Sequence, residues 1–270
     1  MKRILRGRRL LITGASSGIG RCLAEQAASR GARLALVARS GEVLQELARK
    51  LTASGAHAVA IPADLTLEGD RQRLVRTAVE RLGGLDVLIN NAGVGSWAHF
   101  ADSSEEILRQ IMEVNFFAPA ELIRLAIPHL TAGQQPAIVN LASMCGRRGM
   151  PAWTEYSASK FALCGLTEAL RGEMVRFGID VLLVLPGLTG SSMSRHLLLN
   201  RGKEKIDFRA GMDPAKVAGG VLRALEQNRA ETVVGRDARW MLLANTLAPR
   251  LVDKLIARRV RKLYAGRPGT

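Results

Sequence analysis

Short apolar runs alternate with amphipathic stretches along most of this 270-residue chain, and this alternation limits the folds open to it. A short apolar run suits a strand, whereas apolar residues that recur every three to four positions suit a helix. The predicted strands cover residues 9–13, 33–38, 58–61, 86–90, 137–141, 179–185 and 232–234. The predicted helices cover residues 18–30, 42–54, 67–82, 105–130, 155–177 and 214–228.

Most of the predicted strands are nearly continuous in apolar residues, which indicates that both of their faces are buried. Strands of this kind that alternate with helices form a parallel sheet with helices on each side. We therefore expect a doubly wound α/β fold of about seven strands in the order 3-2-1-4-5-6-7. Because no linker or repeat divides the chain, we predict one domain over residues 1–235, extended by a basic, amphipathic helical tail over residues 236–270.

Two helix starts carry recognisable caps. Ser103 and Glu106 fit a capping box at the start of the helix predicted for residues 105–130. Asp213 places a capping carboxylate directly before a first-turn proline, Pro214.

The positive charge of the chain is concentrated at its two ends. The formal net charge is +15, of which residues 1–9 contribute +5 and residues 236–267 contribute +7. The rest of the chain is therefore nearly neutral. Basic ends attract phosphate groups nonspecifically, but the sequence has no nucleic-acid recognition motif and no basic patch interleaved with aromatic residues. We predict no specific nucleic-acid partner.

The composition is that of an ordinary globular protein, with 47% hydrophobic and 23% charged residues. No apolar run reaches the ~18–20 residues that span a bilayer, and the basic N-terminus leads into an apolar stretch too short for a secretory signal. Cys22, Cys145 and Cys164 lack metal-ligand spacing, and the four histidines are scattered. These features predict a cytoplasmic protein with buried or neutral thiols and no metal site.

A glycine-rich turn joins the first predicted strand to the first predicted helix. Its sequence after Thr13 is Gly14, Ala15, Ser16, Ser17, Gly18, Ile19 and Gly20. Glycines let a backbone turn tightly and approach a pyrophosphate closely, and the new helix presents unpaired N–H groups to that anion. A tight strand-to-helix connection without a ligand is the simpler alternative, but the position after the first strand favours dinucleotide binding.

The end of the second predicted strand indicates which dinucleotide binds. An NAD site usually places a carboxylate there, on the ribose 2′-hydroxyl. This chain has Arg39 at that position, and a guanidinium pairs well with a 2′-phosphate. We therefore predict NADP(H) as the preferred cofactor, with NAD(H) and an exposed, uninvolved arginine as the alternative.

Tyr156 and Lys160 lie four residues apart on a predicted helix, so both side chains reach the same ligand. A free tyrosine has a pKa near 10, and a nearby ammonium favours the phenolate. We expect Lys160 to lower the pKa of Tyr156, which suits the pair to protonating a carbonyl oxygen.

Taken together, these motifs resemble those of the short-chain dehydrogenase/reductase family, whose fold is of the Rossmann type. The resemblance covers about residues 8–235. It rests on the glycine turn and Tyr156/Lys160, joined in the family's order and spacing by Asp64, Asn90, Asn91, Ala92, Gly93, Asn115, Ser143, Pro186 and Gly187.

The resemblance implies a division of catalytic roles. Tyr156 would be the general acid in reduction and the general base in oxidation. Lys160 would hold the nicotinamide ribose, Ser143 would hydrogen-bond the substrate oxygen, and Asn115 would hold a water in a proton relay behind Lys160.

The resemblance also implies the cofactor contacts. Asn91, Ala92 and Gly93 would pack beside the adenosine ribose, and the backbone from Pro186 to Thr189 would close over the nicotinamide. The full set expected to bind the cofactor is Gly14, Ser16, Ser17, Gly18, Ile19, Gly20, Arg39, Asp64, Leu65, Asn91, Ala92, Gly93, Tyr156, Lys160, Pro186, Gly187, Thr189 and Ser191. Ser191 departs from the family, which often has threonine there, but keeps the hydroxyl.

Trp97, Trp153 and Met193 lie in segments that line the substrate cleft in relatives, and ordinary packing explains them equally well. Residues 238–264 of the tail combine an apolar stripe, marked by Leu247 and Leu251, with a basic face. That pattern is typical of a helix in a membrane interface. Packing on its own domain or on a partner subunit is the alternative.

These features predict an NADP(H)-dependent reductase of lipophilic ketones or aldehydes, such as steroid-, retinoid- or fatty-acyl-like compounds. The alternatives are a 3-oxoacyl-acyl-carrier-protein reductase and a non-catalytic cofactor-binding sensor or scaffold. The resemblance further implies a homodimer or homotetramer built on the helices at 105–130 and 155–177. The tail would let the enzyme sit peripherally on the inner face of a membrane.

Overall fold

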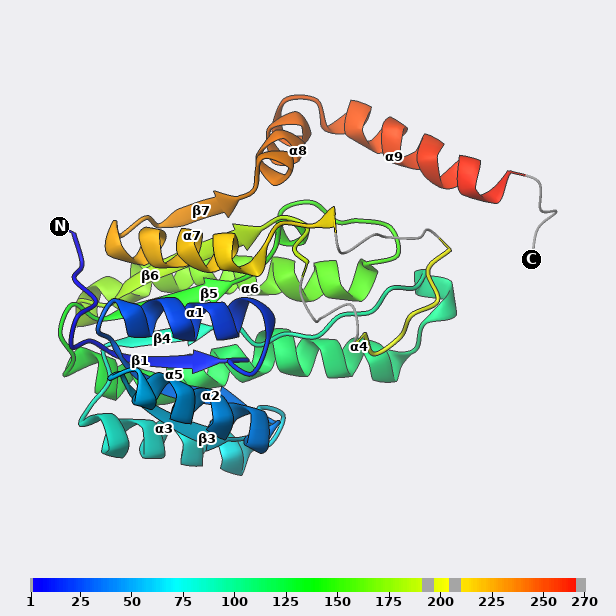
Figure 1. Cartoon of the computed structure of the whole chain (residues 1–270). Coiled ribbons are helices and arrows are strands. Elements are labelled where there is room, and N and C mark those ends of the chain that lie inside the picture. Colours follow the sequence, from blue (N-terminus) through cyan, green and yellow to red (C-terminus); the bar gives the residue numbers. More distant parts are fainter. Residues whose placement is uncertain (1, 191–196, 204–209, 266–270) are drawn as a thin grey trace.

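The computed structural model describes residues 2–190, 197–203 and 210–265. A seven-stranded parallel sheet forms its centre, in the order β3-β2-β1-β4-β5-β6-β7 (Figure 1). The strands are β1 (Arg9–Thr13), β2 (Arg33–Ala38), β3 (His57–Pro62), β4 (Val87–Asn90), β5 (Ala137–Leu141), β6 (Asp180–Pro186) and β7 (Glu231–Val234). The predicted doubly wound fold and strand order are confirmed, and each strand lies within one residue of its predicted bounds.

Helices cover both faces of this sheet. They are α1 (Gly18–Ser29), α2 (Gly41–Ala53), α3 (Glu68–Leu82), α4 (Glu105–Met112), α5 (Ala118–Thr131), α6 (Thr154–Glu173), α7 (Pro214–Glu226), α8 (Arg236–Leu247) and α9 (Pro249–Tyr264). Helices α1, α2 and α7 contribute to one hydrophobic cluster, whereas α3 and α5 contribute to another.

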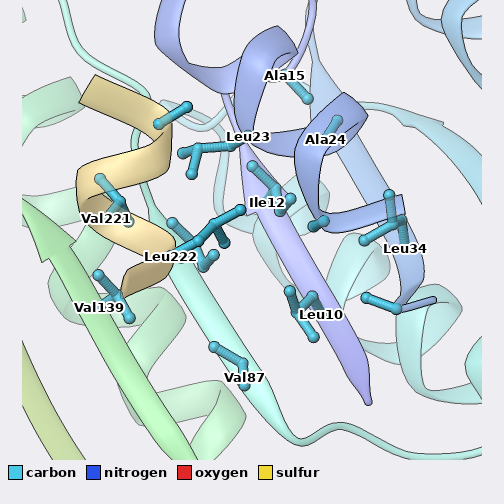
Figure 2. Close-up of a cluster of buried hydrophobic side chains, with 14 of the residues drawn as sticks. Leu10, Ile12, Ala15, Leu23, Ala24, Leu34, Val87, Val139, Val221 and Leu222 are labelled. Atoms are coloured by element: carbon cyan, nitrogen blue, oxygen red, sulfur yellow. The ribbon is translucent and has the colours of Figure 1, made fainter. Parts of the chain in front are cut away.

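Strand β1 shows why the strand sequences are apolar throughout. Its side chains point alternately to opposite faces of the sheet. Leu10 and Ile12 belong to the first cluster, where they lie beneath α1 and α7 (Figure 2), and Leu11 belongs to the second. All three are fully buried. A polar residue at any of them would face a helix rather than solvent.

The helix predicted for residues 105–130 is interrupted. Helix α4 ends at Met112, a π-helical turn follows over Glu113–Phe117, and α5 begins at Ala118. Pro119 has no N–H to donate to the carbonyl of Asn115 four residues earlier, so the regular helical bonding breaks there. The interruption places Asn115 at a widened turn inside the molecule.

One predicted cap is confirmed and one is wrong. Asp213 caps α7 by accepting a hydrogen bond from the Ala215 N–H at 2.8 Å. The cap of α4 is Ser104, whose Oγ accepts from the Ile107 N–H at 3.3 Å. Ser103 lies one residue too early, because its own N–H closes the preceding turn onto the Phe100 carbonyl.

The basic N-terminus is built into the fold. Arg3 is 4% exposed and donates to the carbonyls of Gln135 and Leu225, at 2.9 and 2.6 Å, and to the Asp180 carboxylate at 2.7 Å. These bonds tie the first residues to the amino-terminal ends of β5 and β6.

The tail forms two helices. Helix α8 follows β7, and α9 runs from α8 beyond the carboxyl ends of the strands (Figure 1). Within the described residues, no helix combines the length and the apolar character needed to cross a membrane. The division into a domain at 1–235 and an extension at 236–270 stays a prediction.

Replacing Arg3 with alanine should lower the free energy of unfolding by about 1–3 kcal/mol, because three hydrogen bonds of a buried guanidinium are lost. Urea denaturation measures the change, with Lys2→Ala as the control because Lys2 is exposed. Equal stabilities of the two variants would show that the N-terminal segment contributes nothing to the fold.

Candidate active site

The glycine turn after β1 has the geometry of a phosphate-binding loop. Gly14 and Gly18 adopt φ values of 68° and 53°, a region that side chains other than glycine rarely occupy. A Cβ on Gly20 would stand 2.1 Å from the Gly14 carbonyl oxygen. The turn therefore requires glycine at three positions, and it delivers the backbone to the start of α1.

The turn is fixed to the end of β4 by hydrogen bonds. The Asn91 side-chain amide donates to the Thr13 carbonyl at 2.8 Å. The Thr13 hydroxyl accepts from the N–H groups of Asn91 and Ala92, each at 3.0 Å. β1 and β4 are neighbours at the point where the strand order reverses, which is where ligands bind in open α/β sheets.

A cavity of about 420 Å³ opens along this edge of the sheet. It brings together twelve of the predicted cofactor-binding residues: Gly14, Ser16, Ser17, Gly18, Ile19, Gly20, Arg39, Asp64, Leu65, Asn91, Ala92 and Gly93. It also takes in residues that the sequence analysis did not select: Val37, Ala38, Ser40, Val43, Ala63, Val94 and Val114. Most of these flank a predicted site residue at a strand end, so proximity along the chain is the signal that identifies them.

Arg39 and Asp64 occupy different parts of the cavity wall. Arg39 is exposed directly after β2, where its guanidinium is accessible to a ligand. Asp64 follows β3, and its Oδ1 accepts from both the N–H and the hydroxyl of Thr66, at 2.9 and 2.8 Å. The Asp64 carboxylate is thus held in place by its own loop.

Tyr156 and Lys160 project from α6 near the end of β5. Both are buried, at 8% and 3% exposure. The Lys160 Nζ donates to the Leu141 carbonyl at 3.1 Å and lies 5.7 Å from the centre of the Tyr156 ring. Ser143, two residues beyond β5, lies close enough to the Tyr156 phenol to favour its ionised form.

Asn115 joins the catalytic helix to the cavity wall. Its side chain makes a reciprocal pair with Val94, accepting from the N–H and donating to the carbonyl, both at 2.9 Å. The same Nδ2 donates to the Ser159 Oγ at 2.9 Å. A Cβ built on Gly93 would lie 3.1 Å from the Asn115 Oδ1 and 3.4 Å from the Lys160 Nζ. Asn115 and Lys160 thus lie next to Gly93, a residue that lines the cavity.

A buried chain of polar side chains, of which the sequence analysis named only Asn90, supports this arrangement. Asn90 on β4 donates to the Asn140 Oδ1 on β5 at 2.8 Å, and Asn140 donates to the Thr167 Oγ1 on α6 at 2.9 Å. All three residues are at most 4% exposed. They lock β4, β5 and α6 in register beneath the site.

Burial dominates the protonation equilibria of the pair. It raises the pKa of Tyr156 above its usual value; negative charge on the Cys145 thiolate would add to that effect, and the Ser143 hydroxyl opposes it. Burial also lowers the pKa of Lys160 to about 8. The expected lowering of the Tyr156 pKa by Lys160 is therefore not what the structure shows, because the same burial that keeps the phenol neutral weakens the lysine's hold on its proton.

The loop after β6 approaches the same edge. The Gly187 N–H donates to the Val234 carbonyl at 2.9 Å, and the Thr189 hydroxyl donates to the Gly187 carbonyl at 3.0 Å. Pro186 ends β6. These residues do not line the cavity described above, and Ser191 and Met193 lie outside the described residues.

An aromatic row leads away from Tyr156. Trp153 packs edge-on against Tyr156 with ring centres 5.4 Å apart, and Trp97 follows at 5.3 Å from Trp153. A Cβ on Gly95 would meet Trp153, Tyr156 and Leu197. The row brings together residues from the loop after β4 and the turn before α6. Sequence reasoning singled out both tryptophans but not Leu197 or Gly95.

The depressed pKa of Lys160 predicts how its contribution to stability depends on pH. Between about pH 8 and 10.5 the unfolded chain binds this proton more than the folded chain does. Folding is therefore favoured as the pH rises through that window. The wild-type free energy of unfolding, minus that of Lys160→Met, should increase from pH 7.5 to 9.5 in urea denaturation. A flat difference would contradict the described burial.

Comparisons with known proteins agree with this geometry. A family model for short chain dehydrogenases matches residues 8–201. The ketoacyl reductase HetN of Nostoc is 33% identical over 261 residues, which cover 93% of this chain and 88% of that protein.

Two similar solved structures are short-chain dehydrogenases with bound cofactors. One, from Burkholderia phymatum in complex with NAD, is 25% identical with a TM-score of 0.83, covering 92% of this chain and 96% of that one. The other, from Burkholderia cenocepacia in complex with NADP, is 26% identical with a TM-score of 0.80, covering 94% and 99%. The fold, the site and these matches together show that the chain is an oxidoreductase of the short-chain dehydrogenase/reductase family.

Proposed function

We propose that this protein is an NADP(H)-dependent reductase that converts a lipophilic ketone or aldehyde into its alcohol. The observation that carries the proposal is that Asn115 and Lys160 lie next to Gly93, which lines the cavity, with Tyr156 beside Lys160 and Ser143 beside Tyr156. A carbonyl placed there would face an acid, a cation and a hydroxyl at once.

The cavity suits a dinucleotide. A Cβ at Gly14 or Gly20 would collide with the Asn91 amide, so only glycine allows the turn to pack this tightly and to present its backbone to a ligand's phosphates. The start of α1 offers N–H groups to a pyrophosphate. When bound, NADPH supplies the hydride for the reaction.

The residues of the chain would handle the proton. Tyr156 donates its phenolic proton to the carbonyl oxygen as negative charge develops there. Its raised pKa keeps the phenol protonated until that moment. Ser143 hydrogen-bonds the same oxygen and orients it. Lys160 holds the nicotinamide ribose, and Asn115 positions the water through which the proton is replaced.

Arg39 favours the 2′-phosphorylated cofactor. It is exposed at the cavity wall after β2, where an NAD-preferring site would place a carboxylate. A guanidinium binds a phosphate with paired hydrogen bonds. NAD(H) is the alternative cofactor.

The aromatic row favours an apolar substrate. Trp97, which is buried, and Trp153 extend from Tyr156 as a row of uncharged rings. A steroid-, retinoid- or fatty-acyl-like carbonyl compound fits that surface. The ketoacyl reductase among the relatives supports the second candidate, a 3-oxoacyl-acyl-carrier-protein reductase. A non-catalytic sensor would have no use for the buried Tyr156, Lys160 and Asn115 together.

We also propose that the protein assembles as a homodimer or homotetramer through the helices α4, α5 and α6. Phe117, at the end of the π turn, is 49% exposed, and Phe161 on α6 is 45% exposed. A partner copy would cover these rings.

The outward side of the tail suits an anionic lipid surface. Trp240, Leu247 and Leu251 are 69%, 75% and 56% exposed, and basic residues such as Lys254 flank them. Exposed apolar residues beside cations favour a membrane interface. A second copy would bring its own positive tail, which disfavours self-association at this face. We therefore propose peripheral binding at the inner face of a membrane.

Tyr156→Phe should lower kcat at least 100-fold, because the general acid is lost while the ring and its packing stay. Turnover of a panel of ketones with NADPH measures the loss, and calorimetry should give an unchanged NADPH Kd. Turnover that survives the substitution would remove Tyr156 from the mechanism.

Arg39→Ala should weaken NADPH binding about tenfold, or about 1.4 kcal/mol, and leave NADH binding unchanged. Calorimetric titration of both cofactors measures the effect. Arg49→Ala is the matched control, because Arg49 is an exposed cation of α2 that does not line the cavity. An equal loss of affinity for both cofactors would show that Arg39 does not bind the 2′-phosphate.

Leu247→Glu combined with Leu251→Glu should reduce binding to phosphatidylglycerol vesicles at least fivefold in sedimentation assays. Leu67→Glu with Val175→Glu is the control, since it makes the same charge change at exposed apolar sites outside the tail. Equal binding by both double variants, or equal binding to phosphatidylcholine, would contradict the membrane proposal.

A further inference from the structure

Helix α9 is fastened near both of its ends. Near its start, Arg148 pairs with Asp253 at 2.6 Å and donates to the Asn245 Oδ1 of α8 at 3.0 Å. At its end, the Tyr264 ring lies edge-on to His99, with ring centres 5.4 Å apart. The Lys203 Nζ stands 3.8 Å from the centre of the same ring. Tyr264 lies eleven positions after Asp253, so α9 spans roughly 16 Å between these two contact points.

The residues that contact α9 lie in the same segments as Trp97 and Trp153, or are bonded to them. Arg148 lies in the turn between Ser143 and Trp153, and His99 lies two residues after Trp97. Lys203 follows Gly202, whose N–H donates to the Trp97 carbonyl at 2.8 Å, and Arg201 donates to the same carbonyl at 2.7 Å. A continuous path of contacts therefore runs from Tyr264 through Lys203 and the Trp97 backbone to Trp153 and Tyr156.

The face of α9 that turns inward is apolar. Val252 is 6% exposed, and Ile256 and Val260, each one turn further on, are half-buried. The outward Leu251 and Leu255 are more than half exposed. The inward side of the helix is thus the row Val252, Ile256 and Val260. Val252 is buried on this side, and Ile256 and Val260 are only partly covered.

We infer that Tyr264 is a specificity-determining residue of this enzyme. Its contacts with His99 and Lys203 hold α9 against the Trp97 loop and residues 197–203. These contacts fix the distance of both segments from Tyr156, and that distance sets the size of the carbonyl compound that reaches Tyr156. This role rests on the proposed reductase function for its effect on substrates, but the pinning itself does not.

Removal of the ring tests the inference directly. Tyr264→Ala should raise KM at least fivefold for the shortest effective members of a series of straight-chain 2-ketones, because they lose the wall that holds them. The longest members should change by less than twofold. Tyr264→Phe is the matched control, because it keeps the ring that contacts His99 and Lys203. The kcat for the shortest ketone and the NADPH Kd should stay within twofold in both variants, since Tyr264 lies outside the cofactor cavity.

A second measurement does not depend on turnover. In a Trp240→Phe background, the remaining tryptophans are Trp97 and Trp153 of the aromatic row. Tyr264→Ala should at least double their quenching by acrylamide, and Lys203→Ala should act in the same direction. Tyr264→Phe should leave quenching unchanged.

The two measurements separate the inference from the proposed function. Increased quenching in a protein that reduces no carbonyl compound would refute the reductase proposal while supporting the pinning by Tyr264. Unchanged quenching and an unchanged chain-length profile in Tyr264→Ala would overturn the inference.

Discussion

The backbones at the ends of β1 and β4 are held together by Asn91, whose amide donates to the Thr13 carbonyl at 2.8 Å while the Thr13 hydroxyl accepts from two N–H groups beyond β4. Contact this close leaves no room for a Cβ on Gly14 or Gly20. The turn therefore opens at the point where the strand order reverses, and the cavity forms there. Every other part of the site is placed relative to this junction.

Burial then shifts the pKa values of Tyr156 and Lys160. Lys160 and Tyr156 are enclosed by α6, the end of β5 and the loop after β4, so their charged forms are both disfavoured. Hydrogen bonds along the Asn90–Asn140–Thr167 chain join β4, β5 and α6 beneath this pair. This hydrogen-bonded network holds the backbone beneath Tyr156 in place, so the neutral phenol keeps a fixed position.

The two basic ends of the chain differ in burial because they contact different groups of the fold. Arg3 finds a carboxylate and two backbone carbonyls at the amino-terminal edge of the sheet and becomes part of the core. The tail leaves β7 at the opposite edge, where its inward stripe packs and its cations stay outside. Charge at a terminus thus says little about a binding partner until the neighbouring acidic groups are placed.

The sheet, its strand order and the glycine turn were all predictable from the amino-acid sequence, because continuous apolar strands and the spacing of glycines depend only on local chain geometry. The sequence also selected twelve of the residues that line the cavity. Only the folded structure shows the burial that raises the Tyr156 pKa and the path of contacts from Tyr264 to Trp97. These depend on contacts between segments far apart in the chain, whose distances and desolvation no local pattern encodes.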